Sequence, residues 1–548
     1  MKHLDAGRLA KLTLAAAVAW ALPQASLAQS QQLSQALPRQ PLADALDSLA
    51  KISGLQFVYS ADLAAGITSQ GAAAGRSVEE ALREILRDTG LTYEFINERT
   101  VTIARSGLAP QSRNVDELLE TVNVFGTLDT PLTVGSKTGQ SLRETPKSVT
   151  IVTRERIEAQ NLTTVTEAMQ QATGITVRPY DPVQSWYYAR GYRVDVTQLD
   201  GGAPITAGFG NFSSPDSAMF ERIEVLRGVD GMFSGAGDPG GVINLVRKRA
   251  LRSPALNVTA SAGSWNNYRL ELDATGSLAR DGQMRGRAVG VFEDKEYFWD
   301  RADSNKKMVY GVLENDIGSD IVVSVGGVYE NRRDNGYWYG GVPRYADGRD
   351  LHLSRTRSLV PDWGFSETTT KEVFAKLDYD IRDNLALAMN VTYQDQQSES
   401  LTAYVKGAIN PVTLTGASFT SWANDTPSER AAVDLHLKGS FELFGREHKF
   451  AVGGDYSKSD GGGARFFYMM GYPFVNGPTV DVFNFNPSLL PRPNRVLNPA
   501  AFTNRISPVY GQVQYGGYAT LGLQLADPLR LTIGGRYTNY EQEEQSYR

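Results

Sequence analysis

The C-terminal half of the chain alternates apolar and polar residues, which is the pattern of strands with two different faces. In Met284–Phe292, Ile321–Tyr329, Leu385–Tyr393 and Leu529–Tyr537, an apolar residue opens a series of alternate positions that ends eight residues later in an aromatic. The segment His448–Tyr456 runs the same way. Eight steps of ~3.3 Å, tilted by ~40°, climb about 20 Å, close to the ~25 Å apolar band of a transmembrane barrel. The pattern predicts an antiparallel transmembrane β-barrel.

The intervening side chains are expected to face the lumen, among them Asp434, His436, Lys438, Arg530, Thr532 and Arg536. Short turns are predicted at Asp281-Gly282, Gly318, Asp383-Asn384, Gly445 and Asp527-Pro528. After a short loop at 264–267, long loops are predicted at about 294–304, 333–368, 395–428 and 460–509. Short turns at one end and long loops at the other are typical of outer-membrane barrels. Residues 254–548 hold eleven predicted strands. Because bacterial single-chain barrels close with an even number, we expect about half a barrel and a fragment of a longer protein.

Helical and strand periods alternate between residues 35 and 105. Apolar residues recur at helical spacing in 41–52, a strand is predicted at 55–59, and Ser77 with Glu80 forms a capping box before a second helix that Gly90 ends. Two strands follow at 91–96 and 100–104. This order predicts a small βαβ-βαββ domain with its own core.

The first 28 residues have the pattern of a secretory signal peptide. Lys2, Arg8 and Lys11 precede the apolar run 12–22, and small residues stand at Ser26 and Ala28. Eleven apolar residues are too few for a membrane-spanning helix. Residues 106–119 have no sustained period and are predicted to be a linker. The β-prone segment Glu120, Thr121, Val122, Asn123 and Val124 after it fits two interpretations, the first strand of the next domain or a strand offered to a partner's sheet.

The middle of the chain, from residue 127 to 249, is rich in glycine and in short motifs. These are ETPKSVTIVT (144–153), TGITVRPY (173–180), YARGY (188–192), ERIEVLRGVDG (221–231) and SGAGDPGGVINLV (234–246). Gly235, Gly237 and Gly240 match G-x-G-x-x-G, but the β-branched run after Gly241 predicts a strand where a dinucleotide site needs a helix. We therefore reject a nucleotide site. Such dense glycines instead favour loops that pack closely in a confined space.

Composition adds exclusions. The 55 basic and 61 acidic residues give a net charge of −6, the pI is about 5.5, and cysteine is absent. These values argue against a nucleic-acid partner, and the missing cysteines exclude disulfides and thiol chemistry. The mean hydropathy of −0.31, with no run of 18 apolar residues beyond the N-terminus, excludes membrane-spanning helices but not a barrel of alternating residues. No convincing catalytic grouping or metal-ligand spacing is found, so no enzyme activity is predicted.

Together these motifs resemble the TonB-dependent siderophore receptors, specifically the signal-transducing subgroup close to ferric-pyoverdine receptors. The resemblance implies a signal peptide (1–28), a secretin/TonB short N-terminal signalling domain (29–106), a linker with the TonB box (107–126), an α+β plug domain (127–253) and the first half of a barrel (254–548). About 11 of about 22 strands would be present. The box is placed at Glu120–Val124. Tyr192 and Val229 depart conservatively from the family's plug motifs.

The resemblance also implies an activity and partners. A ferric siderophore is captured between the plug and the barrel, TonB with ExbB and ExbD drives plug movement, and the N-terminal domain signals to an inner-membrane anti-sigma regulator. The expected location is the Gram-negative outer membrane, with the N-terminal domain in the periplasm. No covalent cofactor is expected. Iron arrives already chelated, because His352, His436 and His448 are scattered through the mature chain.

Aromatic and cationic side chains are the ligand-binding candidates, since aromatic faces stack on a chromophore and arginines offset an anionic chelate. They are Tyr180, Trp186, Tyr187, Tyr188, Arg190, Arg193, Phe209, Phe212, Tyr337, Trp338, Tyr339 and Trp363. The alternative for each is girdle or core packing. Structural plug residues are expected at Glu224, Arg227, Gly228, Gly231, Gly237, Pro239, Gly240 and Gly241, with Glu224 and Arg227 as candidate partners of barrel charges. A haem, cobalamin or glycan ligand, or a secretin-like export pore, remains an alternative.

Overall fold

The computed structural model describes residues 36–53, 56–58, 67–87, 89, 91–97, 100–105, 131–179, 184–206, 214–279, 282–336, 341–461, 465–470, 479–490, 492, 504–506, 509–527 and 529–545. The predicted signal peptide, linker and TonB box lie outside these residues. The chain divides into two compact units, residues 1–118 and 119–548. Within the described ranges, no helix is long and apolar enough to cross a membrane.

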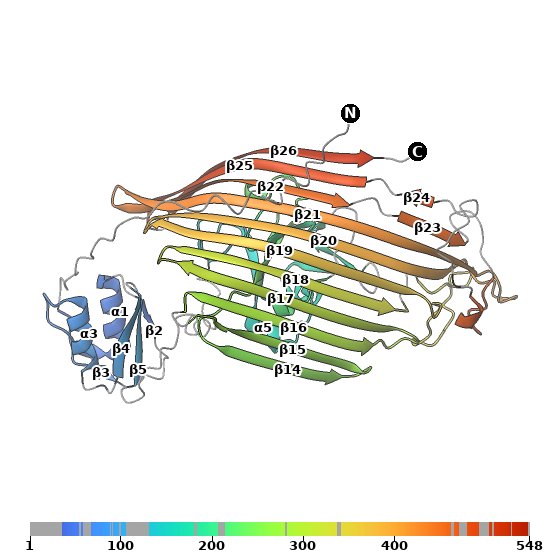
Figure 1. The fold of residues 1–548 in the computed structure, drawn as a ribbon, viewed down its shortest axis with the longest axis horizontal. Coiled ribbons are helices and arrows are strands. Elements are labelled where there is room, and N and C mark those ends of the chain that lie inside the picture. The colour runs from blue at the N-terminus through green and yellow to red at the C-terminus, as the bar shows by residue number, and fades with distance from the viewer. Residues whose placement is uncertain are drawn as a thin grey trace. The chain divides into compact units, whose positions relative to one another are not determined.

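The first unit has the predicted α+β order. Helices α1 (Leu42–Ser53) and α3 (Val78–Leu86) accompany a three-stranded sheet, ordered β2 (Gln56–Val58), β5 (Thr100–Arg105) and β4 (Leu91–Asn97), while β1 (Gln40–Pro41) pairs with β3 (Thr68–Ser69) (Figure 1). The capping box is present: the Glu80 N–H donates to Ser77, and Glu80 accepts from the Ser77 N–H at 3.0 Å. Leu46, Leu82 and Ile85 are fully buried between the helices and the strands. The predicted order of helices and strands is confirmed, whereas Gly90 lies outside the described residues.

The plug is built on a five-stranded sheet in the order β11 (Ile205–Thr206), β10 (Val196–Leu199), β13 (Gly241–Arg247), β12 (Phe220–Arg227), β6 (Ser148–Thr153). Helices α5 (Arg154–Ala159) and α6 (Val165–Gln171) add Ile157 and Met169 to its core. A second small sheet contains β7 (Ile175–Pro179), β8 (Ser185–Ala189) and β9 (Tyr192–Arg193). Strand β13 begins at Gly241, directly after the glycine motif, which confirms that the motif does not open a helix.

The second half forms one large antiparallel sheet. Its eleven consecutive neighbours are β14 (Ala255–Gly263), β15 (Asn267–Ser277), β16 (Met284–Glu296), β17 (Asp303–Ile317), β18 (Ile321–Asn335), β19 (Phe365–Arg382), β20 (Leu385–Lys406), β21 (Ser418–Leu443), β22 (Arg446–Gly461), β25 (Val509–Ala526) and β26 (Leu529–Gln545). Two short strands lie outside this order: β23 (Arg465–Met470) pairs with β21, and β24 (Asn504–Ile506) pairs with β23. The predicted eleven strands are therefore present. The expected half-barrel and total strand number stay predictions.

One predicted loop was wrong. Residues 395–428 were expected to be a long connection, but β20 and β21 extend through most of this range, and the connection is only 407–417. Polar residues such as Gln396 and Ser398 are typical of a loop. They continue the β20 ladder with β21 instead, because beyond an apolar band both faces of a strand can be polar.

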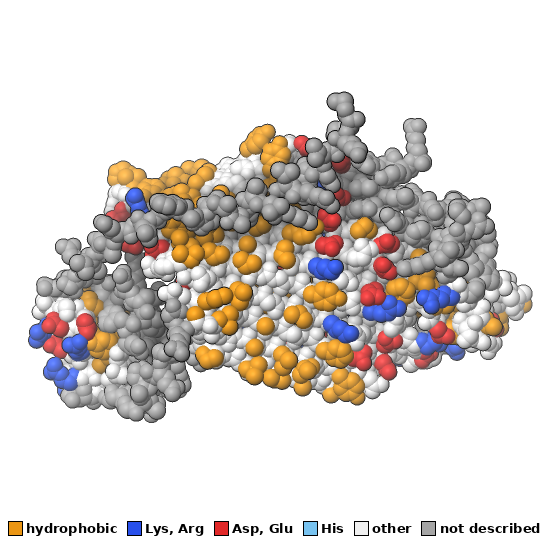
Figure 2. All heavy atoms as spheres, viewed as in Figure 1, with side chains coloured by type: hydrophobic (Ala, Val, Ile, Leu, Met, Phe, Trp, Pro, Cys, Tyr) orange, Lys and Arg blue, Asp and Glu red, His pale blue; other side chains and the backbone are white. Residues whose placement is uncertain are grey.

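The two faces of the large sheet differ as predicted. The aromatics that end the alternating series, Phe292, Tyr329, Tyr393 and Tyr456, are exposed on the outer face. Figure 2 shows hydrophobic side chains spread over this face, with charged ones gathered toward the long-loop end. The inner face carries Val289, Met308 and Tyr310, which are buried with plug residues in one continuous core. The plug therefore packs against the inner face of the large sheet.

Candidate functional site

Ion pairs join the plug to the inner face of the large sheet, and all of them except the half-buried pair of Glu144 and Arg530 are buried. The pairs are Asp216 with Arg269 and Lys306, Arg247 with Glu372, Lys248 with Asp273, Lys137 with Asp434, and Glu144 with Arg530. The contacts of Lys137 and Glu144 confirm that Asp434 and Arg530 face the lumen. Removing one partner of such a pair is costly, because the other charge stays buried and uncompensated.

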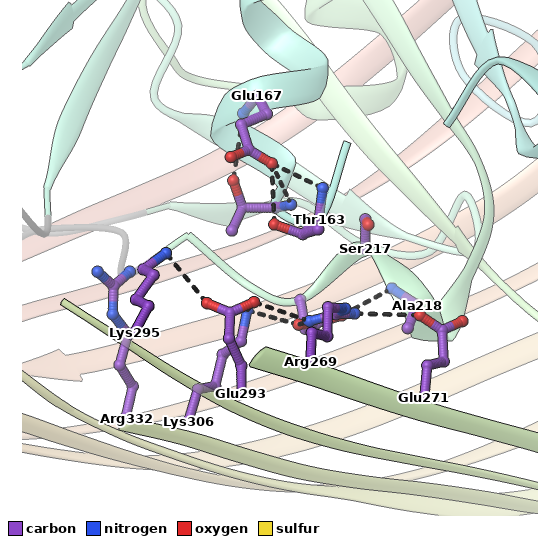
Figure 3. A network of polar contacts seen from close by, with 12 residues as sticks. Thr163, Glu167, Ser217, Ala218, Arg269, Glu271, Glu293, Lys295, Lys306 and Arg332 are labelled. Carbon is purple, nitrogen blue, oxygen red and sulfur yellow. Dashed lines mark hydrogen bonds and ion pairs between the residues drawn. The ribbon is translucent and has the colours of Figure 1, made fainter. Parts of the chain in front are cut away.

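Asp216 is the centre of the largest of these clusters. Figure 3 shows its partners Arg269 and Lys306 with the neighbouring Glu293. The carboxylate of Asp216 is fully buried and accepts a two-pronged hydrogen bond from Arg269, at 2.8 and 2.9 Å, and an ion pair from Lys306 at 2.6 Å. Glu293 lies 3.2 Å from Arg269 and 3.7 Å from Lys306. Burial alone would raise the pKa of Asp216, but the charges of Lys306 and Arg269 outweigh it and hold the pKa well below its ordinary value.

Local sequence sets the backbone that presents Asp216. Thr164 and Glu167 form a capping box at the start of α6, and the N–H of Val165 donates to the carbonyl of Pro215 at 3.1 Å. Asp216 itself accepts from the N–H of Ala218 at 2.9 Å, at the start of the 3₁₀ turn η2 (Ser217–Met219). These hydrogen bonds within the plug thus orient the carboxylate toward the large sheet. Sequence inspection missed Asp216, although an Asp just before a turn is a capping signal.

Arg247 forms a second junction at the end of β13. Its guanidinium bonds Asp200 of the plug at 2.5 Å and Glu372 of β19 at 2.6 Å, and it lies 4.1 Å from the ring centre of Phe374. Burial lowers the pKa of Arg247, but the two carboxylates outweigh burial and raise the pKa. The guanidinium therefore remains a charged bridge between the plug and the sheet.

Glu224 has a different role from the expected one. It is fully buried, but its charge partner is Arg222 at 2.8 Å, which belongs to the plug and not to the large sheet. The carboxylate also accepts the N–H groups of Thr133 and Val134, at 3.1 and 2.9 Å. The predicted plug-to-barrel pairing is therefore wrong for Glu224, because its side chain on β12 contacts segment 131–134 of the plug and not the large sheet. Arg227 is half-buried and packs over Gly174; no described sheet carboxylate pairs with it.

The glycines after β12 permit close backbone approaches. A Cβ on Gly240 would collide with the carbonyl of Arg193, and one on Gly241 with that of Leu226; a Cβ on Gly237 would lie 2.9 Å from Val196. Gly228, with a φ of +99°, donates to the carbonyl of Gly240 at 3.0 Å. Gly231 opens the short helix α7 (Gly231–Ser234) without a close approach, and Pro239 is exposed. Confined packing thus accounts for most of this motif.

The ligand candidates separate into three groups. Trp186 lies between two cations, 5.8 Å from Arg178 and 5.5 Å from Arg193, while Tyr188 is half-buried and Arg190 is exposed. Tyr187 is buried in the plug core and bonds Thr166 at 2.7 Å. Trp363 packs edge-on against Phe419 and donates to the carbonyl of Leu490, against a cluster formed by the long loops and the adjoining ends of β20 and β21. Tyr180, Phe209, Phe212, Tyr337, Trp338 and Tyr339 lie outside the described residues.

Three family models match the chain in the order of these parts. They are the Secretin and TonB N terminus short domain at residues 55–106, the TonB-dependent Receptor Plug Domain at 141–242, and the TonB dependent receptor-like beta-barrel at 310–548. The chain belongs to the TonB-dependent receptors. It is therefore a Gram-negative outer-membrane protein whose N-terminal domain lies in the periplasm.

Ferric-pyoverdine receptors are among the named relatives. The chain is 32% identical to the ferric-pyoverdine M114 receptor PbuA of a Pseudomonas species and 30% identical to the ferripyoverdine receptor of Pseudomonas aeruginosa, each over 96% of this chain and 64% of the relative. The crystal structure of the P. aeruginosa receptor bound to ferripyoverdine matches with a TM-score of 0.71 and 27% identity, over 94% of this chain and 67% of that chain. The chain thus spans about two-thirds of the length of these relatives. They are named as receptors, not as enzymes.

Proposed function

We propose that this chain imports a ferric siderophore of the pyoverdine type across the outer membrane, driven by TonB with ExbB and ExbD. One observation carries the proposal: the likeness to ferric-pyoverdine receptors runs over 94–96% of the chain. The likeness to the Escherichia coli ferrichrome transporter covers only 75%. The three modules in one chain also favour a receptor over an export pore. Iron is the cargo, and it enters as a chelate; none of the described residues form a group of three or more ligands for a metal ion.

Trp186 is the described residue best suited to contact such a chelate. Its indole is held between Arg178 and Arg193, so the ring is oriented and the positive charge beside it offsets an anionic ligand. Tyr188 and Arg190 follow on the same segment. Tyr187 supports this segment from the core and does not present its ring to the surface.

Ligand binding tests this assignment. Binding of ferric pyoverdine is measured by fluorescence quenching. Trp186→Ala should bind with at least a roughly tenfold weaker affinity than wild type, in line with the loss of one aromatic hot spot. Trp265→Ala is the matched control, because Trp265 lies between β14 and β15, packs edge-on against Phe298 and is not among the ligand candidates. Equal affinity of wild type and Trp186→Ala would refute the role of Trp186. Failure of the wild type to bind any ferric siderophore would refute the proposed function itself.

The energy-coupling and signalling parts are separable. Val122→Pro removes a backbone donor from the proposed TonB box, so iron uptake should fail while ligand binding persists. Equal loss of binding and uptake would contradict the box assignment. Deleting residues 29–106 should abolish induction of receptor synthesis through the anti-sigma regulator yet leave transport intact. Loss of transport would show that the N-terminal domain is not a separate signalling module.

A further inference from the structure

The segment around Asp216 and the start of helix α6 form one hydrogen-bonded block within the plug. Asp216 and Thr164 form an antiparallel bridge, and the N–H of Thr166 donates to the side chain of Ser214 at 2.7 Å. We call residues 162–166 and 214–217 the docking block. Its Asp216 carries the contacts with the large sheet, so a shift of either segment changes how the plug is docked.

Tyr187 connects the docking block to the segment of the ligand candidates. It lies on β8 between Trp186 and Tyr188, and successive residues of a strand face opposite sides. The two neighbours are half-buried, but Tyr187 is 3% exposed, and its hydroxyl bonds that of Thr166 at 2.7 Å. The Ser214 side chain also hydrogen-bonds the phenol. One hydroxyl thus ties β8 to both parts of the docking block.

The docking block borders a small cavity on its sheet side. The cavity has a volume of about 90 Å³ and lies between the plug and β18–β21, with Val165, Tyr187 and Pro215 in its plug wall. Glu330 lies in the opposite wall and accepts the N–H of Asp216 at 3.2 Å. Dense packing resists displacement, whereas the wall of a cavity loses fewer contacts when it moves. Movement of Tyr187 therefore has room beside the contact of Asp216 with the sheet.

We propose that Tyr187 is a positioning residue that couples ligand binding at Trp186 and Tyr188 to the docking of the plug at Asp216. A ligand that repositions β8 moves the phenol, and the hydrogen bonds of the phenol move the docking block with it. An importer must release its plug when it is loaded, so binding weakens the contacts of Asp216 with the sheet. The inference rests on the proposed import of a ferric siderophore and deepens it.

Amide hydrogen exchange measures this coupling, because the N–H of Asp216 is released when its contact with Glu330 opens. Saturating ferric pyoverdine should raise the exchange rate of this amide at least roughly fivefold in wild type, the lower end of typical coupling factors. In Tyr187→Phe, the ligand should leave the rate unchanged. Tyr310→Phe is the matched control and should keep the ligand effect, because it removes another buried hydroxyl at the plug–sheet junction, which donates to the carbonyl of Lys248.

The outcomes separate this inference from the proposed function. An unchanged or slower rate in liganded wild type, or a ligand effect that survives in Tyr187→Phe, would overturn the coupling. Binding of ferric pyoverdine is measured in parallel by fluorescence quenching. A wild type that binds no ferric siderophore refutes the proposed function and the coupling with it, whereas binding without faster exchange at Asp216 refutes only the coupling.

A measurement without ligand tests the hydroxyl link by itself. Tyr187→Phe keeps the ring in the plug core and removes only the hydroxyl, so the variant should fold. The amides of Val165 and Thr166, which donate to Pro215 and Ser214, should exchange faster than in wild type, whereas those of β12 should not change. Unchanged exchange in the docking block, or an equal increase throughout the plug, would overturn the positioning role.

Discussion

Asp216→Asn offers the sharpest test of how the plug is held. The substitution preserves the shape of the side chain but removes the charge that faces Arg269 and Lys306, whose side chains are only 7% and 3% exposed. Glu293, at 3.2 and 3.7 Å, compensates only part of the two remaining cations. Because breaking a buried pair by removing one partner costs about 3–5 kcal/mol, we expect plug docking to weaken by this amount.

Amide hydrogen exchange measures this loss. Opening of the plug exposes the amide of residue 216, which in the docked state donates to Glu330 of β18 at 3.2 Å. A loss of about 3–5 kcal/mol corresponds to an increase of roughly 10²- to 10³-fold or more in its exchange rate. Amides of the large sheet away from the plug should exchange at the wild-type rate. This difference separates plug release from global unfolding.

Two further variants control for the interpretation. Glu271→Gln removes another carboxylate that contacts Arg269, at 3.1 Å, but this one is more exposed, so a change below about 1 kcal/mol is expected. The double variant Asp216→Asn, Lys306→Met lacks one of the two uncompensated cations. Its plug amides should therefore be better protected than those of Asp216→Asn alone, so the effects of the two substitutions are not additive. Wild-type protection in Asp216→Asn, or simple additivity in the double variant, would refute the view that this buried charge cluster holds the plug.

Three other predictions follow from the same geometry. The lowered pKa of Asp216 means that its stabilising contribution is complete above the unfolded carboxyl pKa of ~3.9 and is lost as pH falls through the lower folded value. Plug protection should therefore not decrease as pH falls from about 8 to 5 and should decrease only in acid. A loss of protection that begins on acidification near neutral pH would contradict this. Glu224→Ala leaves the buried N–H groups of Thr133 and Val134 without an acceptor, at a cost of at least about 2 kcal/mol, and should speed amide exchange in 131–134 before the rest of the plug; unchanged exchange there would show that Glu224 does not hold this segment. Gly240→Ala should destabilise the plug by about 1–3 kcal/mol in urea unfolding because its Cβ meets the carbonyl of Arg193, whereas Gly290→Ala enters open space and should be near neutral; equal effects would contradict a steric role for Gly240.

Local interactions made much of the fold predictable from the chain alone. The capping box of Ser77 and Glu80 is closed within four residues, and the strands of the large sheet follow from their alternation. The β-branched run after Gly241 identified β13 for the same reason. Such features depend on neighbours a few positions away. The predicted 395–428 loop failed because polarity on both strand faces resembles a loop when the partner strand is not known.

The sequence by itself therefore determined the modules, most of the strands and the family, since these depend on periodicity and short motifs. Only the tertiary structure decided which groups the buried charges meet: Asp216 with Arg269 and Lys306, and Glu224 with segment 131–134. These partners come from distant strands whose register the sequence does not display. The physical reason is that the interaction energy of a charged side chain depends on its burial and on its distance from other charges, and both are set by the packing of the chain.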